Sequence, residues 1–141
     1  MRIVPDLLTK QDMIAAKLQA AKTAAIGRIN AAAGDLRRSF ITSIPGQEML
    51  YLAKENEARL YIADPAPDMA DYPLTAAEIG PGLTAPDAWS LAQIWLNMGA
   101  QWRAVGAQIE TVRLGAVYAI EAAVDETEIA AIEAAYQGSL P

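Results

Sequence analysis

The chain contains neither cysteine nor histidine. Without cysteine it can form no disulfide, no thiolate metal site and no cysteine nucleophile. Without histidine it also lacks the commonest general base, the commonest metal-binding side chain and the usual partner of a serine nucleophile. Carboxylates, tyrosine or lysine could still support catalysis. These two absences nevertheless predict a protein that is not an enzyme and that binds no metal or other cofactor.

Long hydrophobic runs are also missing. No apolar stretch approaches the roughly 18 residues that a membrane-spanning helix requires. The first six residues, Met1–Asp6, include a proline and an acid where a signal peptide would carry its apolar segment. The sequence therefore predicts no association with a membrane.

Alanine is abundant and large aromatic residues are few. Of 141 residues, 30 are alanine and only one is phenylalanine, although 53% of the chain is hydrophobic. Alanine has the highest intrinsic helix propensity and its small side chain lets helices approach closely. The composition indicates an all-α fold of closely packed helices.

The charges are unevenly distributed along the chain. Residues 1–44 contain seven basic and three acidic side chains, whereas residues 45–141 contain four basic and fourteen acidic ones. A basic segment can contact nucleic acid, but no aromatic residue lies among these basic residues before Phe40. A solvated face, or complementarity to the acidic remainder, is the favoured interpretation. We predict no nucleic-acid partner, a basic, alanine-rich N-terminal helical segment over 1–44 and a helical bundle over 45–141.

Capping patterns mark where helices begin. Thr9 lies three residues before Asp12, which predicts a first helix over about 10–42 with a break or bend near Gly34. Pro45 predicts the start of a second helix over 45–63. Its inward face is expected to comprise Met49, Leu52, Ala53, Leu60 and Ala63, with Asn56 as a polar interruption. Thr75 and Asp125 are expected to begin two shorter helices.

The strongest periodicity lies in the second half of the chain. Apolar residues recur at alternating four- and three-residue steps in a helix expected over 86–122. Such a sustained heptad pattern is typical of a helix that winds around a partner. We interpret it as the core seam of an elongated helical bundle, shared with the chain's own helices or with further copies. The seam residues are Leu91, Trp95, Met98, Trp102, Val105, Ile109 and Val112.

Several polar or aromatic residues merit consideration as a functional site. Glu48, Tyr51 and Glu55 could form an acid–base site, but Glu55 and Arg59 also have the spacing of a helix-stabilising ion pair. The latter interpretation is favoured. Aspartates in the segment 64–73 could bind Ca²⁺, but their spacing fits no known calcium loop. Trp89 lies off the heptad seam, which makes it a candidate contact for a partner.

Two stretches of sequence resemble a known family. The first is FITSIPGQEMLYLAKENEARLYIADPAPDMADYPLTAAEIG, and the second is AQIWLNMGAQWRAVGAQIETVRLGAVYAIEAA. They resemble a helical domain of unassigned function at the C-terminus of many tail and tail-fibre-region proteins of tailed bacteriophages. The resemblance covers about residues 36–135. It rests on the residues Pro45 to Glu48, Tyr51, Lys54, Glu57, Ala58, Tyr72, Pro73, Ala77, Glu78, Trp102, Glu110 and Arg113.

This resemblance implies a biological setting. It suggests a structural component of a tailed-phage virion, made in the host cytoplasm and located at the tail or the tail-fibre attachment region. It supplies no catalytic residues. The expected partners are other phage tail proteins and further copies of the chain, with a trimer as the favoured assembly. The expected attachment residues are Lys10, Lys17, Arg28, Arg37 and Arg38. A tail or tail-fibre assembly chaperone that is absent from the virion is the alternative.

Overall fold

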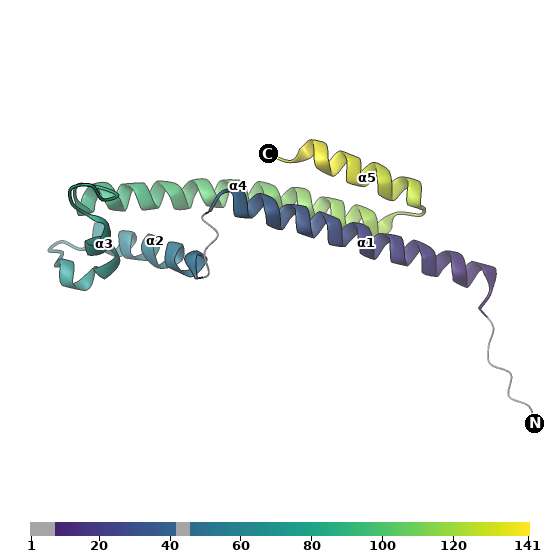
Figure 1. Cartoon of the computed structure of the whole chain (residues 1–141), viewed down its shortest axis with the longest axis horizontal. Coiled ribbons are helices and arrows are strands. Elements are labelled where there is room, and N and C mark those ends of the chain that lie inside the picture. The colour runs from purple at the N-terminus through teal and green to yellow at the C-terminus, as the bar shows by residue number, and fades with distance from the viewer. Residues whose placement is uncertain (1–7, 42–45) are drawn as a thin grey trace, which may run out of the picture. The chain divides into compact units, whose positions relative to one another are not determined.

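The computed structural model describes residues 8–41 and 46–141, and its secondary structure is helical (Figure 1). Five α-helices and one turn of 3-10 helix occur in these two stretches, and no strand occurs there apart from a single bridge between Ile79 and Ala85. The predicted all-α class is confirmed, as is the long helix expected over 86–122, which is α4. The elements are α1 (Lys10–Ser39), α2 (Gln47–Ala63), η1 (Met69–Asp71), α3 (Pro73–Glu78), α4 (Ala88–Ala122) and α5 (Glu126–Ser139).

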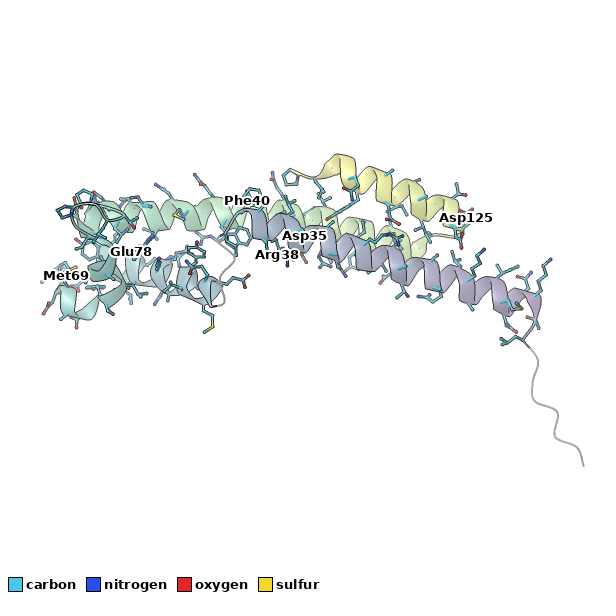
Figure 2. The ribbon with its side chains drawn as sticks, in the orientation of Figure 1. Asp35, Arg38, Phe40, Met69, Glu78 and Asp125 are labelled. Carbon is cyan, nitrogen blue, oxygen red and sulfur yellow. The ribbon has the colours of Figure 1, made fainter. Side chains whose placement is uncertain are left out.

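Side-chain caps fix the starts of three helices. Thr9 and Asp12 form a reciprocal capping box at α1, in which each backbone N–H donates to the other side chain. Asp87 accepts from the Ser90 N–H before α4, and Asp125, labelled in Figure 2, accepts from the Glu128 N–H before α5. Hydrogen bonds from the Thr9 and Ser90 backbones lower the pKa values of Asp12 and Asp87, respectively.

The predicted break near Gly34 is wrong, because α1 continues to Ser39. A glycine inside a helix costs about 1 kcal/mol relative to alanine. Here Ala33 is fully buried and Arg37 forms an ion pair with Glu110 of α4. These tertiary contacts on either side of Gly34 offset its low helix propensity.

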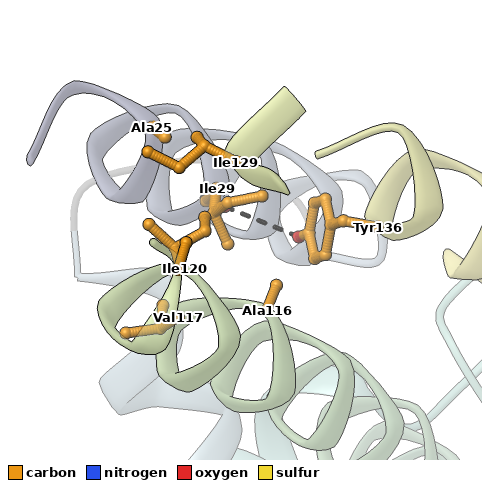
Figure 3. Close-up of a cluster of buried hydrophobic side chains, with 8 residues drawn as sticks. Ala25, Ile29, Ala116, Val117, Ile120, Ile129 and Tyr136 are labelled. Carbon is orange, nitrogen blue, oxygen red and sulfur yellow. Dashed lines mark hydrogen bonds between the residues drawn. The ribbon is translucent and has the colours of Figure 1, made fainter. Parts of the chain in front are cut away.

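The chain divides into two compact units, and the first combines its two ends. This unit comprises the residues up to Arg37 together with Ala107–Pro141. Within it, α1 and α5 pack on the C-terminal part of α4 (Figure 1). Ile29 lies among Ile120, Ile129 and Tyr136 in the core, and the Tyr136 hydroxyl donates to the Ile29 carbonyl at 3.5 Å (Figure 3). The two ends of the chain therefore share one hydrophobic core.

The second unit comprises Arg38–Gly106. In it, α2 and α3 pack with the N-terminal part of α4 around a core of Ala58, Ala85, Leu91, Ala92 and Trp95. The boundary between the units therefore differs from the division predicted at residue 44. Most of the basic N-terminal helix belongs to the same unit as the C-terminal helix.

The heptad seam of α4 differs in exposure along its length. Leu91 and Trp95 are buried in the second unit, and Ile109 is buried in the first. Trp102, Val105 and Val112 are partly buried, whereas Met98 is 49% exposed. The chain itself therefore buries residues at both ends of the seam, and Met98 between them is exposed.

The predicted inward face of α2 is wrong. Met49, Leu52 and Leu60 are 77%, 68% and 56% exposed, and Ala53, Asn56 and Ala63 are exposed as well. The opposite side of the helix, which includes Lys54 and Ala58, packs into the second unit. Ion pairs and a helix cap, described below, allow polar residues to occupy this inner side.

Candidate functional site

The inner side of α2 holds a lysine against aromatic rings. Lys54 forms an ion pair with Glu78 of α3 at 2.6 Å, and its side chain is only 12% exposed. Its ammonium nitrogen also lies 5.4 Å from the ring centre of Trp95 and 5.9 Å from that of Tyr51. A carboxylate and two aromatic faces together compensate this cation for its lost hydration. Lys54 therefore links α2 to both α3 and α4.

Glu55 is buried between two arginines. It forms ion pairs with Arg59 of the same helix at 2.5 Å and with Arg103 of α4. Its carboxylate lies directly against Gly99, where the Cβ of any other residue would overlap it. Both ion pairs tether the carboxylate to the scaffold, one within α2 and one to α4. The geometry therefore favours a structural role for Glu55 over the acid–base role considered from the sequence.

Glu57 caps the short helix α3. Its carboxylate accepts from the backbone N–H of Leu74 at 3.1 Å and from that of Thr75 at 3.3 Å. Both Glu57 and Thr75 are buried. The first N–H groups of a helix have no partner within the helix. A side chain of α2 therefore satisfies donors that α3 cannot satisfy itself.

The acidic connection between α2 and α3 is held by a tyrosine. The Tyr72 hydroxyl donates to Asp64 at 2.6 Å, and its ring meets that of Tyr61 edge-on at 5.6 Å. The hydrogen bond to Asp64 is the largest cause that raises the pKa of Tyr72 to about 12, and the same bond lowers the pKa of Asp64. Asp68 accepts from the Ala70 N–H. In the described ranges, no three potential metal ligands are grouped together.

Of the remaining acid–base candidates, Glu48 is exposed and Tyr51 lies beside Lys54. A hollow of about 450 Å³ borders α4 and the C-terminal residues of the first unit, lined by Ala107, Gln108, Thr111, Val112, Ser139 and Pro141. It is open and contains no titratable side chain. Neither Glu48 nor Glu55 lines this hollow.

The expected attachment residues fall into two groups. Arg28 forms an ion pair with Glu133 of α5 at 2.6 Å, and Arg37 forms one with Glu110 of α4 at 2.5 Å. Lys10, Lys17 and Arg38 are exposed. Part of the basic charge of α1 therefore pairs with acids elsewhere in the chain, as complementarity between the basic and acidic segments would require.

Glu110 connects α1 to α4 and makes stability depend on pH. Hydrogen bonds from Arg113, assisted by Arg37, lower its pKa from 4.5 to about 2. A lowered pKa in the folded state stabilises the fold above pH about 4.5, and this stabilisation is lost as the pH falls toward 2. We expect Glu110→Gln to reduce the loss of stability in this range, measured by urea unfolding at a series of pH values.

Glu121→Gln, which changes an exposed glutamate of the same helix, is the matched control. If both variants lose stability with falling pH as steeply as the wild type does, Glu110 has no such role.

One stripe along the exposed side of α2, between the exposed Glu48 and Arg59 and the opposite edge, contains no charged residue. At 100° per residue, Met49, Leu52, Ala53, Asn56, Leu60 and Ala63 fall within an arc of about 100°. We call these six residues the outer face of α2. All six are exposed, while Glu55, Glu57 and most of the Lys54 side chain are buried. Charged side chains are seldom buried without partners, and contiguous exposed apolar surface is typical of interaction sites.

Exposed apolar side chains occur elsewhere in the chain as well. Trp89, the candidate partner contact, is 56% exposed, and Leu83 is 55% exposed. No helix that lies within the described ranges combines the length and apolar character needed to cross a bilayer. Comparisons with protein-family models, curated proteins and solved structures found no match to this chain.

Proposed function

We propose that the chain is a self-associating structural protein of a tailed-phage virion, acting as a helical adaptor at the tail or the tail-fibre attachment region. The outer face of α2 carries the self-association part of this proposal, because it is exposed, free of charge and, apart from Asn56, apolar. The biological setting is inferred from the resemblance over residues 36–135. The proposal assigns no catalytic role to any residue and expects no cofactor, nucleic acid or membrane partner.

The motif residues support a structural role. Lys54, Glu57, Tyr72 and Glu78 belong to the pattern that resembles the phage-tail domain, and each joins α2 or its connection to α3. Residues that form such tethers maintain a shape and leave the opposite surface available for binding. In this interpretation the motif residues hold α2 in position, and the outer face of α2 is the surface that binds another protein.

The sequence predicted an assembly of three copies, with a heptad seam shared either with the chain's own helices or with further copies. Because Leu91, Trp95 and Ile109 are buried by their own chain, they are not free to form an intermolecular core. We therefore assign self-association to the outer face of α2. Lys10 and Lys17, which are exposed on α1, are the proposed contacts to an acidic surface on the particle.

An assembly chaperone is the second candidate. Exposed methionines favour it, since Met13, Met49 and Met98 are 62%, 77% and 49% exposed. Methionine is flexible and polarizable, and it is common on surfaces that bind varied partners. A chaperone would bind tail proteins during assembly and then dissociate from them.

Mass spectrometry of purified particles separates these two functions. A virion component should give peptides of this chain at a fixed molar ratio to a known tail protein, and the ratio should survive repeated density-gradient purification. A chaperone should be abundant in the lysate of infected cells and absent from the purified particles. The latter result would contradict the structural proposal.

A further inference from the structure

We draw no further inference here: the strongest candidate, the groove between α4 and α5 whose two neighbouring hollows share Thr111, Val112 and Ser139, is open and lined mainly by small and apolar side chains, and nothing in the structure shows what covers it.

Discussion

Ile29→Ala is expected to lower the free energy of unfolding by about 2–5 kcal/mol. Ile29 is 1% exposed and lies among the side chains of α4 and α5 in the first unit (Figure 3). Removal of its outer carbons leaves a cavity that close-packed neighbours fill only in part. Urea unfolding, followed by circular dichroism at a fixed protein concentration, measures the change.

Ile14→Ala is the matched control, since it makes the same substitution in the same helix at a residue that is 51% exposed. Its expected effect is within about 0.5 kcal/mol. Equal losses in the two variants would contradict the assignment of Ile29 to a packed core that joins both ends of the chain. Comparison at one concentration is needed, because self-association makes apparent stability depend on concentration.

Glu57→Ala is expected to destabilise the second unit by about 1–3 kcal/mol, since it leaves two backbone N–H groups of α3 without their acceptor. The Thr75 amide is buried, so water cannot readily replace the lost carboxylate. We expect hydrogen exchange at the Thr75 amide to accelerate strongly. Urea unfolding gives the accompanying loss of stability.

Two controls accompany this variant. Glu57→Gln keeps one oxygen acceptor and should lose less stability than Glu57→Ala. Glu48→Ala removes an exposed glutamate from the first turn of the same helix and should leave exchange at Thr75 unchanged. If hydrogen exchange at the Thr75 amide is unchanged in Glu57→Ala, the hydrogen bonds from α3 to Glu57 do not stabilise α3.

Local signals in the sequence predicted three helix starts, but Thr75, which was expected to begin a helix, lies inside α3, which starts at Pro73. Thr9 with Asp12, Asp87 and Asp125 each form side-chain caps, and a helix begins directly after each of them. These signals are readable because a cap involves residues only two or three positions apart. The break predicted at Gly34 failed because it depended on intrinsic propensity alone, which contacts with α4 override.

The orientation of α2 could not be predicted from hydrophobicity. The apolar positions on its two sides are similar in number, and the difference lies in distant partners. Lys54 requires Glu78 and Trp95, and Glu55 requires Arg103, none of which lies near α2 in sequence. Tyr51, Lys54 and Ala58, which recur at steps of three and four, were the available signal for the packed side.

The sequence also did not reveal which segments make up the first unit. Ion pairs join residues far apart in sequence, such as Arg28 with Glu133 and Arg37 with Glu110. The excess of basic charge before residue 45 suggested a separate attachment segment. The same excess also serves to pair α1 with the acidic C-terminal part of the chain, so charge alone could not locate the boundary between the units.

Native mass, measured by size-exclusion chromatography with light scattering over a concentration series, tests whether the outer face of α2 binds a second copy. We expect the wild type to have the mass of more than one chain, and Leu60→Asp to have the mass of one. Val105→Asp, which changes the partly buried middle of the α4 seam, should leave the assembly intact. A wild type that remains a single chain, or an assembly that Val105→Asp disrupts and Leu60→Asp does not, would contradict the role assigned to this face.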